Sequence, residues 1–183
     1  MKLGAFTLFT FATLVGAPPL CAQSVPEKAE AAMHRVFGVD ATVRTYSLVI
    51  EPADSEAVYD ATGASVSGRV IIREAFDHDN HVLGYGIVDD VRGKEQPITY
   101  IAMMRPDNTL AEIEVLVYRE SYGGEVQYSQ FRDQFKGKGD TRQVRVGHGI
   151  QSIAGATISS NAITKGAQKI LVLFQRWRSE KKL

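Results

Sequence analysis

A run of β-strand patterns separated by short turns most constrains what this chain can fold into. The strand patterns are rich in β-branched and aromatic residues, or alternate between apolar and polar positions. They cover residues 43–50, 69–76, 82–88, 98–104 and 110–118. The turns at 77–80 and 106–108 are too short for a crossover helix, so the strands they join must run antiparallel. The sequence therefore predicts an antiparallel sheet of about four to six strands.

Helical patterns stand at both ends of the chain. After residue 157, apolar residues recur at spacings of three and four, which is the period of one helix face. They are Ile163, Ala167, Ile170, Phe174 and Trp177. We place Thr164 and Gln168 outside this apolar stripe. A first helix is expected at 26–37, a short one at 53–61 and another at 127–135, whereas 137–149 is expected to be a surface loop or an irregular strand. The predicted class is therefore α+β, with a long C-terminal and an N-terminal helix packed on the sheet.

The stretch 154–160 places a turn of small residues directly before the C-terminal helix. The first N–H groups of a helix are unpaired and carry partial positive charge, so such a terminus can bind a phosphate. Gly155 and Ala156 would let a ligand approach the backbone closely, and Thr157 adds a hydroxyl. The alternative is an ordinary helix start, for which this stretch offers several capping residues. They are Ser159, Ser160 and Asn161.

The motif Gly155-Ala156-Thr157-Ile158-Ser159-Ser160 resembles the flavinylation motif of the FMN-binding domain family. This family includes flavin subunits of the sodium-pumping NADH:quinone oxidoreductase and of related electron-transport complexes. The residue after Gly-Ala carries FMN there through a phosphoester bond, which implies Thr157 here. Where the family often has aspartate and serine, this chain has Gln151 and Ala154. Further similar segments are 84–86, 93–94, 97–100, 113–116, 119–121 and 131–138.

The resemblance implies a set of cofactor-binding residues around Thr157. They are Gly155, Ala156, Ser159, Ser160, Glu120, Ser121 and Tyr118. The alternative for 119–121 is a solvated strand end with a weak ion pair. Tyrosines could form an aromatic wall for the flavin or belong to the core. They are Tyr85, Tyr100, Tyr118 and Tyr122.

No metal site and no catalytic residue is predicted. His78 and His81 stand in a turn beside Asp77 and Asp79, but residues three apart there point in different directions. His148 precedes Thr157 and has no assigned role. No acid–base pair or nucleophile arrangement indicates a stand-alone enzyme, so a redox carrier or oxidoreductase component is expected.

The N-terminus has the pattern of a secretory signal peptide. Lys2 is followed by the uncharged, mostly apolar stretch 3–17, and cleavage after Ala22 would leave a single domain at 23–183. Cys21 is the only cysteine, and the large Leu20 before it makes lipoprotein anchoring the less favoured alternative. A formal net charge of zero argues against a nucleic-acid partner.

These features together predict an exported, periplasmic electron-transfer flavoprotein that carries FMN covalently on a threonine. The resemblance implies two partners, a flavin transferase for maturation and a membrane or periplasmic redox protein. The alternative is a non-redox binding module of the same fold that carries no covalent flavin.

Overall fold

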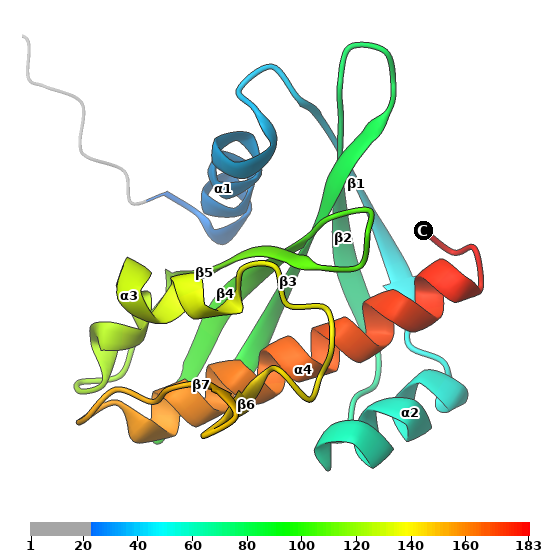
Figure 1. Ribbon diagram of the computed structural model, residues 1–183. Coiled ribbons are helices and arrows are strands. Elements are labelled where there is room, and N and C mark those ends of the chain that lie inside the picture. Colours follow the sequence, from blue (N-terminus) through cyan, green and yellow to red (C-terminus); the bar gives the residue numbers. More distant parts are fainter. Residues whose placement is uncertain (1–22) are drawn as a thin grey trace, which may run out of the picture.

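The computed structural model describes residues 23–183, so the predicted signal peptide at 1–22 and Cys21 lie outside the described residues. A five-stranded antiparallel sheet in the order β1-β2-β3-β4-β5 forms the centre of the fold (Figure 1). Its strands are β1 (Thr42–Val49), β2 (Arg69–Phe76), β3 (Val82–Arg92), β4 (Pro97–Met104) and β5 (Leu110–Val117). The β2–β3 and β4–β5 pairs are antiparallel, as the two short turns predicted, and β1 with β2 and β3 with β4 pair in the same way.

Helices cover both faces of this sheet. The long helix α4 (Thr157–Ser179) lies along one face, and α1 (Val25–Phe37) lies on the other (Figure 1). The shorter α2 (Pro52–Thr62) packs against α4. The predicted α+β class, with a long C-terminal and an N-terminal helix, is confirmed.

The sheet has a separate apolar core on each face. Along β4, Tyr100 and Ala102 face the α4 side, whereas Ile101 and Met103 face the α1 side, which is the two-residue period of a strand. Because nearly every residue of β4 is buried, this interior strand contributes side chains to both cores. The apolar stripe of α4, ending in the fully buried Trp177, completes the larger core.

Two polar residues of α4 correct the predicted stripe. Thr164 and Gln168 are 2% and 7% exposed, so the prediction that they lie outside the buried face is wrong. The loop after residue 137 covers this side of the helix, and the Gln168 side-chain amide donates a hydrogen bond to the carbonyl of Thr141 at 3.1 Å. Thr164 donates its hydroxyl to the carbonyl of Ser160. Burial is therefore possible because both polar groups find partners.

The segment between β5 and α4 is more irregular than predicted. The helix expected at 127–135 is present only as two short pieces, α3 (Ser129–Arg132) and η2 (Asp133–Phe135), which follow the separate helical turn η1 (Gly124–Gln127). The loop that follows contains the two-residue strands β6 (Arg145–Val146) and β7 (Gly149–Ile150). Buried apolar side chains anchor this whole segment. They are Val126, Phe131, Phe135, Val144 and Ile150.

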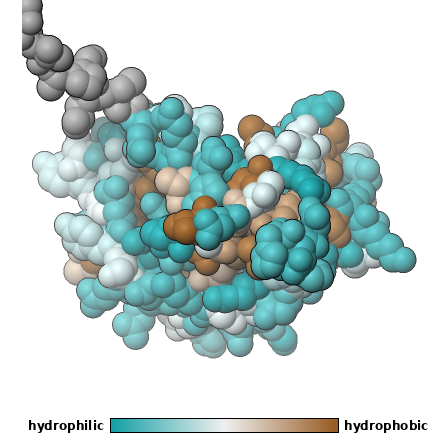
Figure 2. Space-filling view, turned by 90° about the horizontal axis from the view of Figure 1, so that it is seen from above, coloured by the Kyte–Doolittle hydropathy of each residue, from teal (hydrophilic) through white to brown (hydrophobic). Residues whose placement is uncertain are grey.

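The surface is mixed. Figure 2 shows hydrophilic residues over most of the visible face, with apolar residues in smaller patches between them. Among residues 23–183, the helices include none with the length and apolar content needed to cross a bilayer.

Candidate functional site

A cleft of about 320 Å³ lies at the start of α4. Three segments that are distant in sequence form it: the β3–β4 turn, the loop after β5, and the first turn of α4. The lining residues are Lys94, Glu95, Glu120, Ser121, Tyr122, Gly123, Gly155, Ala156, Thr157, Ile158 and Ser159. The structure therefore brings six of the predicted site residues to one place, together with Tyr122, which was named as a possible aromatic wall, and four residues that were not predicted.

Thr157 is the first residue of α4, and its side chain is exposed on the cleft. The turn before it depends on Gly155, whose φ of +84° is a conformation that residues with a side chain rarely adopt. A Cβ at Gly155 would meet nothing within 4 Å, so glycine serves the backbone conformation there and not close packing. Thr157 is thus presented at the surface on a turn of fixed shape.

The N-terminus of α4 is uncapped. Ala156 occupies the N-cap position without a side-chain hydrogen bond, and the first turn contains no acidic residue. The first backbone N–H bonded within the helix is that of Ser160, to the carbonyl of Ala156 at 2.8 Å. The N–H groups of residues 157–159 have no acceptor among the described residues. They therefore offer the donors and the partial positive charge that favour an anion.

Tyr118 and Ser159 form a hydrogen-bonded pair behind the cleft. The Tyr118 hydroxyl donates to the carbonyl of Tyr122, so the 2.9 Å contact between Tyr118 Oη and Ser159 Oγ has the serine as donor. Burial raises the pKa of Tyr118, against the opposing effect of the Ser159 hydrogen bond. Ser159 keeps only its acceptor lone pairs for a ligand, and the pair fixes the loop after β5 against the first turn of α4.

Glu120 holds the opposite wall of the cleft in place. Its Oε1 accepts hydrogen bonds from the backbone N–H groups of Glu95 at 2.7 Å and Gln96 at 3.1 Å. These two bonds lower the pKa of the Glu120 carboxyl. A Cβ at Gly93 would lie 2.3 Å from the same oxygen, so a glycine is needed where the carboxylate meets the hairpin turn. Glu120 therefore ties the β3–β4 turn, which carries Lys94, to the end of β5.

Not every predicted site residue faces the cleft. Ser160 is fully buried, and its Oγ accepts a hydrogen bond from the Ile153 N–H at 3.4 Å, so it fixes the turn before the helix. Tyr118 reaches the cleft only through Ser159. Of the other tyrosines, Tyr85 and Tyr100 belong to the core, whereas Tyr122 is 85% exposed and lines the cleft.

The cleft suits a flavin nucleotide in its chemistry. Ile158 is 52% exposed and, with Tyr122, offers apolar surface for a planar ring. Lys94 also lines the cleft, with its Nζ 4.0 Å from the Glu95 carboxylate, and the uncapped N–H groups lie beside the Thr157 hydroxyl. Lys94 was not predicted as a site residue, although the pair Gly93-Lys94 was already part of the family resemblance.

The histidines lie away from this cleft. His148 is exposed in the turn between β6 and β7. In the β2–β3 turn, Asp77, Asp79 and His81 bring ligand atoms within 4.8 Å of one another. Asp77 already accepts hydrogen bonds from the backbone N–H groups of Asp79 and His81, which explains its position as a turn residue.

Comparison with known proteins agrees with this geometry. The family model described as the FMN-binding domain matches residues 93–172. A search of curated proteins found no match to the chain. Every residue that lines the cleft lies inside the matched range. The matched residues 93–172 hold the whole cleft and most of α4, so this part of the chain is similar to the FMN-binding domain family.

Proposed function

We propose that this protein carries FMN covalently, through a phosphoester bond to Thr157 Oγ1. The observation that carries the proposal is the exposed Thr157 hydroxyl at an uncapped helix N-terminus, inside a cleft that lies wholly within the FMN-binding domain match. The unpaired N–H groups of residues 157–159 would bind the phosphate oxygens. Ile158 and Tyr122 would contact the ring system, and Lys94 would contribute a positive charge.

A separate flavin transferase would form the bond, using FAD as donor. Thr157 Oγ1 would replace AMP on the FMN phosphorus: the new P–O bond forms at the threonine, AMP leaves, and the hydroxyl proton is lost. The reaction requires an exposed hydroxyl with little bulk around it. Gly155 and Ala156, which precede Thr157 in the turn, meet that requirement.

The bound flavin would supply reversible electron transfer, and the chain would supply tethering and orientation. We propose that the protein is exported to the periplasm and exchanges electrons with a membrane or periplasmic redox protein. Covalent attachment suits such a location, because a lost cofactor could not be replaced from the cytoplasm. The open cleft would leave one side of a bound flavin accessible to such a partner.

Intact mass after co-expression with a flavin transferase tests the attachment. The wild-type protein should gain about 438 Da, the mass of FMN less water, and remain yellow after denaturation. Thr157→Ala should remove both signals, whereas Thr157→Ser should keep them because the hydroxyl is retained. Asn161→Ala is the matched control, since Asn161 bonds to the Thr157 carbonyl but bears no hydroxyl. An unmodified mass for the wild type, or a modified Thr157→Ala protein, would refute the phosphoester.

Redox titration of the loaded protein tests the electron-transfer role. The flavin absorbance should bleach and recover reversibly, and a periplasmic fraction should contain the modified chain. A protein that is colourless in a host with the transferase would instead support the non-redox binding module.

A further inference from the structure

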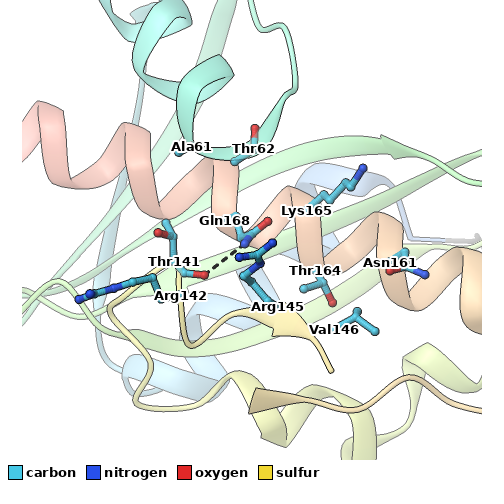
Figure 3. A pocket seen from close by; sticks show the side chains of 10 residues that line it. All are labelled: Ala61, Thr62, Thr141, Arg142, Arg145, Val146, Asn161, Thr164, Lys165 and Gln168. Carbon is cyan, nitrogen blue, oxygen red and sulfur yellow. Dashed lines mark hydrogen bonds between the residues drawn. The ribbon is translucent and has the colours of Figure 1, made fainter. Parts of the chain in front are cut away.

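A second cavity, which we call the basic pocket, lies on another side of α4. It has a volume of about 330 Å³ and lies between the end of α2, the segment that leads into and includes β6, and α4 (Figure 3). Its lining residues are Ala61, Thr62, Thr141, Arg142, Arg145, Val146, Asn161, Thr164, Lys165 and Gln168. We propose that the basic pocket binds a small phosphomonoester whose organic part carries hydroxyl or amino groups.

Positive charge is concentrated in this pocket. Three cationic side chains line it and no carboxylate does, although the chain as a whole has a formal net charge of zero. Arg142 is paired with Asp140, its Nε lying 2.9 Å from Oδ2. Arg145 and Lys165 form no ion pair with any residue in 23–183. Two cations are thus free to bind a dianion, and guanidinium geometry matches phosphate oxygens.

The floor of the pocket is polar and offers hydrogen-bond acceptors. The Gln168 Nε2 donates a hydrogen bond to the Thr141 carbonyl, which Figure 3 draws as a dashed line. The Gln168 Oε1 is left without a partner among the described residues. Asn161 likewise donates Nδ2 to the carbonyl of Thr157 at 2.9 Å, leaving Oδ1. These oxygens would repel unprotonated phosphate oxygens, but they would accept hydrogen bonds from the O–H or N–H groups of an attached organic moiety. The floor therefore favours an ester over inorganic phosphate.

The walls of the pocket are fixed before any ligand binds. Gln175 and Gln168 donate to the carbonyls of Gly139 and Thr141, which ties the loop to α4 at two points. Val144 is fully buried beneath the loop. The loop backbone that forms this wall therefore needs little ordering on binding, and preorganisation of this kind favours affinity.

The basic pocket and the cleft have different lining residues. The two share none, although Asn161 of the pocket lies one turn after Thr157 and bonds to its carbonyl at 2.9 Å. The inference does not rest on the proposed function. It can be tested on a Thr157→Ala protein that carries no flavin, so the two proposals can fail independently.

Calorimetric titration of purified Thr157→Ala protein tests the proposal with four probes: AMP, glucose 6-phosphate, inorganic phosphate and adenosine. At least one of the two esters should bind saturably at one site, more tightly than inorganic phosphate, and adenosine should not bind. Whether AMP or the sugar phosphate binds more tightly distinguishes a nucleotide from a sugar ester. Raising the salt from about 20 mM to about 300 mM should weaken binding, because the Debye length shortens.

Charge removal provides the decisive comparison. Arg145→Gln with Lys165→Gln should weaken ester binding by about tenfold or more, as expected for lost charge-assisted hydrogen bonds. The matched control is Arg69→Gln with Lys181→Gln, which removes two exposed charges elsewhere and should leave binding unchanged. Three results would overturn the proposal: no saturable binding of either ester, equal weakening in both double variants, or binding of a glutamate-rich peptide with no ester binding.

Discussion

Replacing Asp54 by alanine tests how α4 is held in place, and therefore what positions Thr157 at its far end. Asp54 is fully buried on α2 and accepts three hydrogen bonds. Its Oδ1 accepts from Arg176 Nε at 2.9 Å, and its Oδ2 accepts from Trp177 Nε1 at 3.2 Å and from the Glu51 N–H at 3.1 Å. One carboxylate thus fastens α2 to the last turns of α4.

The expected cost of Asp54→Ala is about 2–4 kcal/mol of unfolding free energy. Alanine leaves the indole N–H of Trp177 buried without an acceptor, which costs about 1–3 kcal/mol by itself. The Arg176 side chain is 32% exposed, so water can solvate its charge when Asp54 is removed. The lost ion pair therefore adds less to the unfolding cost than the loss of a fully buried pair would. At about 3 °C per kcal/mol for a domain of this size, the melting temperature should fall by about 6–12 °C.

Urea unfolding followed by far-UV circular dichroism measures this cost without relying on the altered environment of Trp177. The matched control is Glu180→Gln. Glu180 also pairs with Arg176, at 2.7 Å, but is exposed, so its removal should cost less than about 1 kcal/mol. A cost for Asp54→Ala no larger than that of Glu180→Gln would refute the reasoning that burial gives the first carboxylate its importance.

The pH dependence of the unfolding free energy tests the contribution of the same Asp54 carboxylate. Burial alone raises the pKa of Asp54, but the hydrogen bonds from Arg176, the Glu51 backbone and Trp177 outweigh it and lower the pKa below its ordinary value. Its stabilisation is therefore complete above the unfolded pKa of about 3.9 and is lost as the pH falls through the lower folded value. The stability difference between wild type and Asp54→Asn should accordingly shrink on acidification below about pH 4.

Further predictions concern close approaches at two glycines. Gly166→Ala should destabilise the protein by about 1–3 kcal/mol in thermal unfolding, because its Cβ would lie 2.5 Å from the buried Tyr100 hydroxyl, which outweighs a helix-propensity gain of about 1 kcal/mol. A more stable Gly166→Ala protein would contradict this prediction, because it would mean that the Tyr100 side chain moves away from the added Cβ at little cost. Gly93→Ala should displace the Glu120 carboxylate from the hairpin turn and speed amide hydrogen exchange at residues 95 and 96. Unchanged exchange there would contradict the role given to Glu120.

Local signals account for the parts of the fold that could be predicted. The strands follow from alternation and short turns, and β2 has the predicted bounds because turn residues stand at the end of it. The apolar stripe of α4 follows from its period of three to four residues. Thr164 and Gln168 could not be assigned correctly, because the loop that covers them has no periodic pattern and lies more than one element away in the sequence.

The residues of the candidate site could likewise be predicted only in part. Thr157, Gly155 and Ala156 are adjacent in sequence, so their motif could be recognised directly. The contact of Tyr118 with Ser159 could not be predicted, because it depends on how the loop after β5 folds back onto α4. The place of Lys94 in the cleft could not be predicted either. The pairing of β3 with β4 sets its position, and the spacing of residues along the chain does not indicate it.

The two ends of α4 differ in a way that connects stability to the proposed chemistry. Its C-terminal half is fastened by Trp177 and Asp54, whereas its first turn lacks a capping side chain, a loss of about 1 kcal/mol relative to serine or aspartate. A longer residue at Ala156 has little room, because Ala156 is 2% exposed and Gly123 packs against it. A Cβ added at Gly123 would lie only 3.4 Å from the Ala156 Cα. A capping oxygen there would also occupy the N–H groups that a phosphate needs. The anchored far end therefore allows the first turn to keep its donors free for a ligand.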